Sequence, residues 1–94
     1  MAFARLALFP DATEEQYRAI DKELGDAVKD QPERILHVCG QTDRGWQLIQ
    51  VWQSKEALDQ FISKHLAPAM GRAGKNGYLK PPEIIDFEVA DLLV

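Results

Sequence analysis

The chain has 94 residues and a mass of 10.6 kDa, enough for a single domain over residues 1–94 with one modest hydrophobic core. Apolar residues make up 46% and charged residues 28%, as in globular proteins, and the formal net charge of −4 argues against nucleic acid or an anionic membrane as partner. The single cysteine, Cys39, excludes an internal disulfide and a cysteine-rich zinc site, and because no secretory signal or membrane span is recognisable we expect a cytoplasmic protein.

The first elements predicted are a strand and a helix. Residues 2–9 alternate between a mixed set and an aliphatic set, which indicates an inner strand covered on both faces, and Pro10 ends it. Thr13 followed three residues later by Gln16 predicts a capping box. The apolar spacing that begins at Tyr17 predicts a helix, and Pro32 closes the segment.

A β-hairpin is predicted next. The alternation of residues 33–41 and of 46–52 is typical of strands, and the turn residues 42–45 lie between them. His37 and Cys39 share one face of the first of these strands, and Trp46 and Trp52 share one face of the second. We therefore expect two antiparallel strands with a short loop.

A second helix and a last strand complete the chain. Ser54 is a candidate N-cap, and the stripe from Leu58 to Leu66 has helical spacing. Pro68 is expected to end or kink this helix, with a short continuation beyond it. A glycine-rich stretch follows, and residues 83–90 alternate as a strand does.

The order β-α-β-β-α-β predicts an α+β protein of ferredoxin-like topology, with one antiparallel sheet and both helices on one face of it. Right-handed crossovers place the first and third strands in the middle of the sheet.

The two faces of the predicted sheet differ in chemistry. We expect the helices to cover the aliphatic face, which holds Leu6, Leu8, Leu36, Val38, Ile49, Val51, Ile85 and Phe87. The opposite face would carry Phe3, Arg5, Ala7, Phe9, Ile35, His37, Cys39, Trp46, Leu48, Gln50, Trp52, Asp86 and Glu88. That face is too aromatic to be left in water and too polar for a plain core, as is typical of a ligand pocket or a wet dimer interface. We therefore expect a homodimer that packs through these sheet faces.

Residues 45–61, GWQLIQVWQSKEALDQF, resemble the strand-to-helix signature of the dimeric α+β-barrel proteins, in particular of the antibiotic-biosynthesis-monooxygenase-like group. The resemblance implies a dimeric barrel. Proteins of this superfamily include cofactor-independent monooxygenases, haem-degrading enzymes and isomerases. The chain departs from the pattern at Gln50, where relatives often carry a glutamate base. His65 lies late on the second helix, but the remaining haem motif is not recognisable, so no haem is expected.

Two residues are candidates for catalysis, each with a structural alternative. His37 could deprotonate a phenol or an enolisable substrate, or it could be a hydrogen-bonded interface histidine. Arg5 could stabilise an anionic oxygen, or it could pair with Asp86 or Glu88. Cys39 lies beside His37 without a third ligand, so no metal site is expected.

The candidate substrate-binding residues are mostly aromatic, and each could equally be a packing residue: Phe3, Trp46, Gln50, Trp52 and Tyr78. Taken with the resemblance, these residues imply a cofactor-independent monooxygenase-like or isomerase-like enzyme acting on a hydrophobic aromatic or polyketide-type molecule at the dimer barrel. A non-catalytic dimer, either a small-molecule-binding or a stress-related protein, is the alternative. A cavity of roughly 300–1,000 Å³ lined by Arg5, His37 and a tryptophan would favour the enzyme.

Overall fold

The computed structural model describes residues 1–93, with every side chain in that range except that of Val28. The order of helices and strands confirms the sequence prediction. The strands are β1 (Phe3–Pro10), β2 (Arg34–Thr42), β3 (Gly45–Trp52) and β4 (Glu83–Glu88). The helices are α1 (Glu14–Leu24), α2 (Lys55–Phe61) and α3 (Ala67–Ala73). Short 3₁₀ turns follow α1 (Gly25–Val28) and α3 (Gly74–Asn76), and a π-helical turn (Ile62–Leu66) joins α2 to α3.

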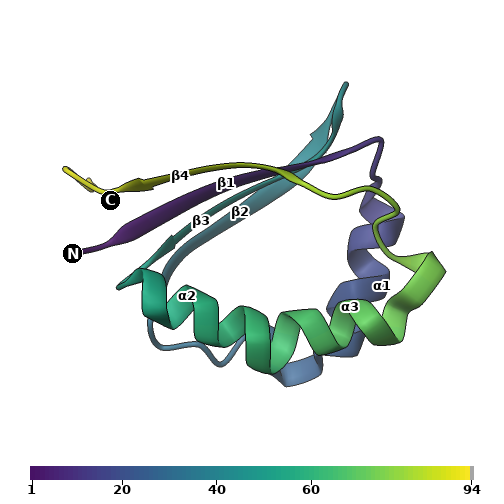
Figure 1. Cartoon of the computed structure of the whole chain (residues 1–94), viewed down its shortest axis with the longest axis horizontal. Coiled ribbons are helices and arrows are strands. Elements are labelled where there is room, and N and C mark those ends of the chain that lie inside the picture. The colour runs from purple at the N-terminus through teal and green to yellow at the C-terminus, as the bar shows by residue number, and fades with distance from the viewer. Residues whose placement is uncertain (94) are drawn as a thin grey trace.

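The four strands form one antiparallel sheet in the order β2-β3-β1-β4, so β1 and β3 lie in the middle as predicted. Figure 1 shows α1 and the α2–α3 segment on the same face of this sheet, while no described element covers the other face. The helices also contact each other, because α1 packs against α3. This arrangement is the ferredoxin-like α+β fold.

The predicted helix starts are confirmed by their hydrogen bonds. The Thr13 side chain accepts from the Gln16 backbone, and the Gln16 side chain accepts from the Thr13 backbone, which completes the capping box. The Ser54 hydroxyl accepts from the Ala57 backbone and caps α2. These local signals fix where each helix begins beneath the sheet.

Pro68 does not end the second helical segment. It lies in the first turn of α3, where a missing N–H costs little, and the irregularity sits just before it in the π-helical turn Ile62–Leu66. The helix therefore does not end at Pro68, and the predicted short continuation beyond it is present as α3, with an irregular π turn just before the proline.

The helices cover the opposite face of the sheet from the one predicted. The aromatic and polar face lies under the helices, where the exposed fractions are 8% for Phe3, 3% for Trp46 and 1% for Trp52. The aliphatic face is the open one, with exposed fractions of 50% for Val38 and 63% for Ile85. The alternation identifies which residues share a face, but it does not say which face the crossovers cover. Below, the inner face is the one under the helices and the outer face is the open one.

A β-bulge in β2 changes which residue reaches the inner face. Arg34 lies opposite Trp52 and Leu36 lies opposite Val51, so Ile35 is the extra residue on β2. Arg34 consequently takes the inner-face place that the alternation had given to Ile35.

Candidate functional site

A cavity of about 220 Å³ lies between the sheet and the helices of a single chain. Its wall is mainly apolar, and its residues come from all four strands, both helical segments and the loop after α3: Arg5, Ala7, Phe9, Tyr17, Ile20, Asp21, Leu24, Arg34, His37, Leu48, Gln50, Leu58, Phe61, Ile62, Leu66, Met70, Tyr78, Pro82 and Ile84. Arg5, His37, Gln50 and Tyr78 therefore line a cavity beneath the sheet of one chain, whereas the expected cavity lay between the sheets of a dimer. The cavity is also smaller than the expected range, and no tryptophan lines it.

Four polar side chains form a row across the inner face. In register, His37 of β2 lies opposite Gln50 of β3, Gln50 lies opposite Arg5 of β1, and Arg5 lies opposite Asp86 of β4. Paired residues on neighbouring strands bring their side chains within contact distance. The row places three predicted site residues together in the cavity wall.

Arg5 forms a bidentate salt bridge with Asp86. Its Nε and Nη2 donate to the two carboxylate oxygens, each at 2.8 Å. The hydrogen bond lowers the pKa of Asp86 and raises that of Arg5, so both groups stay charged at neutral pH. The pairing that was the alternative reading for Arg5 is present, and Arg5 still lines the cavity.

Gln50 is held by Trp52. The indole Nε1 of Trp52 donates to Gln50 Oε1 at 2.9 Å, and Gln50 is only 8% exposed. Because a buried polar group without a partner is costly, this bond accounts for a carboxamide in an otherwise apolar row.

His37 is held by Tyr17 of α1. The Tyr17 hydroxyl lies 3.1 Å from His37 Nε2, while His37 Nδ1 is buried without a described hydrogen-bond partner. Burial, followed by the nearby positive charge of Arg34, lowers the pKa of His37, and burial together with the adjacent Cys39 thiol raises the pKa of Tyr17. At neutral pH the pair is therefore a neutral imidazole and a neutral phenol. The imidazole can accept a proton.

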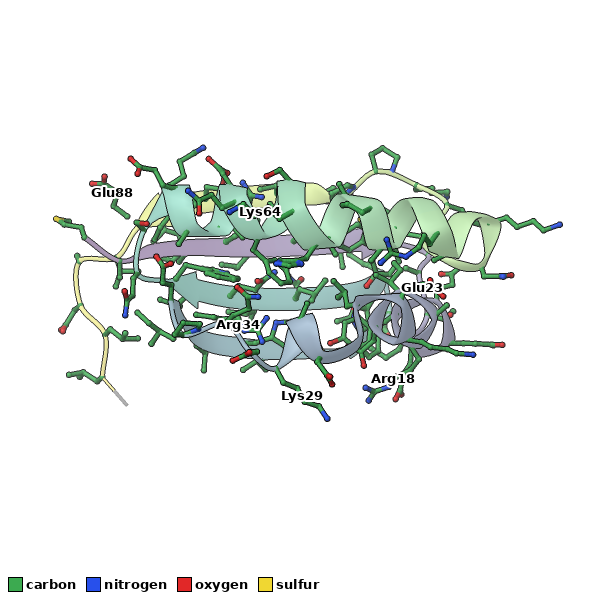
Figure 2. The ribbon with its side chains drawn as sticks, turned by 90° about the horizontal axis from the view of Figure 1, so that it is seen from below. Arg18, Glu23, Lys29, Arg34, Lys64 and Glu88 are labelled. Atoms are coloured by element: carbon green, nitrogen blue, oxygen red, sulfur yellow. The ribbon has the colours of Figure 1, made fainter. Side chains whose placement is uncertain are left out.

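Aromatic rings surround this row. Tyr78 stacks on Phe9 with ring centroids 3.8 Å apart, and the Arg34 guanidinium lies 5.7 Å from the ring centroids of both Trp52 and Phe61. In the view of Figure 2, Arg34 appears between α2 and the 3₁₀ turn that follows α1. A flat, apolar ligand would find ring faces in the wall and a few oriented polar groups, as small-molecule sites commonly offer.

The predicted site residues divide into two groups. Arg5, His37, Gln50 and Tyr78 line the cavity. Phe3, Trp46 and Trp52 are not among its described lining residues and lie in the hydrophobic core instead. Trp46 packs against the Tyr17 ring, with centroids 5.0 Å apart, and Trp52 packs against Phe61 at 5.2 Å. The tryptophans thus support wall residues rather than forming the wall.

Tyr17 and Arg34 are cavity residues that the sequence reasoning missed. Tyr17 is the polar-tipped first member of the apolar stripe of α1, and this feature could have marked it as facing a polar group on the sheet. Arg34 reaches the cavity only because of the bulge at Ile35, for which the sequence carries no clear signal.

Among residues 1–93, no group of three His, Cys, Asp or Glu side chains is arranged to hold a metal ion. In the same range, no helix has the length and apolar character needed to cross a membrane.

Comparison with solved structures identifies this fold. A protein of Chloroflexus aurantiacus J-10-fl assigned as an antibiotic biosynthesis monooxygenase has a TM-score of 0.71 and 16% identity, with 100% of this chain and 98% of that chain covered. SnoaB, a cofactor-independent oxygenase of Streptomyces nogalater, has a TM-score of 0.65 and 14% identity over 98% of this chain and 95% of its own. A dimeric ferredoxin-like protein of unknown function from Jannaschia sp. CCS1 has a TM-score of 0.63 and 17% identity, with 95% of this chain and 100% of that chain covered.

These identities show a shared fold and no more. The chain has the ferredoxin-like architecture of the antibiotic-biosynthesis-monooxygenase-like proteins, as its 45–61 segment indicated. No protein-family model matches the sequence, and a search of curated proteins gives no match either.

Proposed function

We propose that this protein is a cofactor-independent, monooxygenase-like enzyme that oxidises a hydrophobic aromatic small molecule in the cavity beneath its sheet. The observation that carries the proposal is the Tyr17–His37 pair, with its 3.1 Å contact, in the wall of an apolar cavity. A base next to a water-poor cavity is what a reaction that begins with deprotonation requires. The fold shared with SnoaB, a cofactor-independent oxygenase, supports the same class.

The first step would be removal of a proton from an activated C–H or phenol group of the ligand. His37 Nδ1 is buried, so the route from the cavity to the imidazole runs through Tyr17. The ligand's proton passes to the Tyr17 oxygen as the Tyr17 proton passes to His37 Nε2. The pair thus ends with one more proton and the ligand with an extra electron pair.

Molecular oxygen is the oxidant in the second step. The ligand carbanion forms a C–O bond with oxygen and becomes a peroxide. The second hydrogen then leaves that carbon as a proton, and its electron pair forms the C=O bond as the O–O bond breaks. The departing oxygen takes up this proton and the one held by the pair, and leaves as water. A methylene and one oxygen molecule thereby become a carbonyl and one water molecule, so atoms and electrons balance without a cofactor.

Arg5 and Gln50 would orient the ligand and stabilise its negative oxygen. Both line the cavity beside His37, and Tyr78 closes the wall with its ring stacked on Phe9. Donors aimed at a developing oxyanion in a dry site stabilise it much more than they would in water.

We also infer that the protein is a homodimer, and that it packs through the outer face. That face carries apolar side chains from all four strands, of which Ala4 and Val51 are buried and the others are partly or fully exposed: Leu6, Leu36, Val38, Ile49, Ile85 and Phe87. The described chain exposes 6066 Å², against roughly 5,500 Å² expected for a compact monomer of its mass. The structurally similar Jannaschia protein is dimeric. An exposed apolar face of this kind marks an interface.

The test of the proposed reaction is oxygen uptake with a panel of one- and two-ring phenols, naphthalenediols and activated ketones, above the rate without protein. Incorporation of oxygen-18 from labelled oxygen gas into the product is expected. Replacing His37→Gln or Tyr17→Phe should lower the rate by about 10²–10⁴-fold, the usual contribution of a general base. His65→Gln is the matched control, because His65 does not line the cavity and contacts the Phe61 ring instead.

A non-catalytic binding protein is the second candidate, and the Arg5–Asp86 bridge favours it. A guanidinium whose charge is already balanced offers less stabilisation to an anionic intermediate. Under this reading the panel binds without oxygen uptake, and the His37 and Tyr17 variants change affinity only.

A further inference from the structure

The orientation of the Gln50 carboxamide is fixed by Trp52. The indole Nε1–H of Trp52 meets Gln50 at 2.9 Å. An indole N–H can only donate, so the carboxamide oxygen must be the atom that faces it. The Gln50 Nε2 amide group therefore points away from Trp52, and it donates to no described residue. Gln50 is 8% exposed, so this amide lies in the cavity wall rather than in bulk water.

The sheet residues beside this amide present donors rather than acceptors to the cavity. Arg5 lies opposite Gln50 in register, and its Nη1 makes no hydrogen bond to a described residue. Both carboxylate oxygens of Asp86 already accept from Arg5. On the other side, the Nε2 atom of His37 is engaged by Tyr17. On the sheet side of the cavity a ligand therefore meets N–H groups from Gln50 and Arg5, while the other carboxylate of the wall, Asp21 on α1, lies across the cavity with its Oδ2 3.8 Å from Arg18 Nη1.

We infer that the cavity selects a one- or two-ring aromatic ligand with an acceptor oxygen, a carbonyl or a phenolate, facing Gln50 Nε2, and that Trp52 is the positioning residue for this selection. The inference rests on the proposed function only in taking the cavity as the ligand site. The cavity volume of about 220 Å³ suits a ligand of one or two rings, because a protein cavity of roughly 150 Å³ already accommodates benzene. A ligand of three or more rings would extend beyond this volume.

Three probes of nearly equal size test the inference in the full-length protein: indane, 1-indanone and 1-aminoindane. They differ in carrying no polar group, an acceptor oxygen or a cationic donor. In a ¹H–¹⁵N NMR titration, 1-indanone should bind about tenfold more tightly than indane, the value of one good buried hydrogen bond. 1-Aminoindane should bind more weakly than indane. The side-chain amide signals of Gln50 should shift with 1-indanone and stay in place with indane.

Two variants separate the donor from its orientation. Gln50→Glu keeps an acceptor for the Trp52 indole but replaces the amide with an oxygen, so 1-aminoindane should become the preferred probe. Trp52→Phe removes the indole N–H and lets the carboxamide turn, so the preference for 1-indanone over indane should fall towards one. Gln53→Glu makes the same chemical change at an exposed position and should leave all three affinities unchanged.

The outcomes distinguish this inference from the proposed function. If indane and 1-indanone bind equally and the Gln50 amide signals do not respond, the inference is overturned while the cavity remains a ligand site. If none of the three probes binds the unmodified protein, the cavity itself fails as the ligand site. The amide signals are read in the unmodified protein, so the test stands even where a variant folds poorly.

Discussion

At the scale of single residues, the inner face carries polar groups whose partners come from other elements. His37 on β2 is held by Tyr17 on α1, and Arg5 on β1 is held by Asp86 on β4. Each partnership removes the cost of burying a polar group under the helices. These pairs explain how a face with an arginine and a histidine can lie inside the monomer.

His37 should make stability fall on mild acidification. Burial and Arg34 lower its folded-state pKa below the unfolded value near 6.5, while Asp21 opposes them with a smaller effect. The unfolded chain therefore binds a proton first as the pH falls. The free energy of unfolding decreases from about pH 6.5 down to the folded-state pKa, and it is fully retained above this window.

The check is urea unfolding of the unmodified protein and of His37→Gln between pH 7.5 and 5.5. The variant should lose less stability over this interval, because it lacks the group that titrates. Equal losses in the two proteins would mean that His37 is not the buried neutral group described here.

At the scale of elements, the turn between β2 and β3 depends on Gly45. Its φ of 143° is rarely open to other residues, and an added Cβ would lie 2.1 Å from the Phe9 carbonyl oxygen. Gly45→Ala should lower the free energy of unfolding by about 3 kcal/mol or more, because backbone strain and a backbone clash act together. It should also disturb the pairing of Pro10 with Gly45 at this end of the sheet.

Gly71→Ala is the matched control for this substitution. Gly71 lies within α3, and an added Cβ there meets nothing within 4 Å. Alanine should stabilise the helix by about 0.5–1 kcal/mol. Thermal unfolding of both variants checks the pair, and a mild effect at Gly45 would contradict the close approach of the Phe9 backbone.

The elements could be predicted because their signals are local. Thr13 with Gln16 and Ser54 mark helix starts by hydrogen bonds within three residues, and strand alternation is visible in any short window. The strand order also follows, because crossover handedness is general. Pro68 shows the limit, since its place in the first turn of α3 depends on the π turn before it.

The candidate site could be predicted only in part. Arg5, His37, Gln50 and Tyr78 were found because they share an unusual face or lie in an unusual loop. The face that the helices cover was predicted wrongly, because aliphatic composition alone favours the opposite side. Partners such as Tyr17 depend on how α1 is rotated against the sheet, which sequence spacing does not determine.

At the scale of the whole molecule, the outer face should form the dimer. Ile85→Glu places a charge on the edge strand β4 of the apolar patch, at a position that is 63% exposed in the single chain, so the monomer should still fold. Sedimentation velocity should show dissociation with at least a tenfold weaker association, because an unpaired charge is costly to bury. Lys64→Glu, on the exposed surface of the π-helical turn, is the control and should remain dimeric. A dimer undisturbed by Ile85→Glu would place the interface elsewhere.

The account depends most on where a ligand lies, beneath the sheet of one chain or between two sheets. Isotope-filtered NOE spectroscopy of the methyl-labelled protein with bound indane measures this directly. Contacts are predicted from indane to the methyl groups of Met70 and Leu48, which line the cavity. Contacts to Val38, Ile49 and Ile85 on the outer face would contradict a ligand site beneath the sheet and would place the site between the subunits.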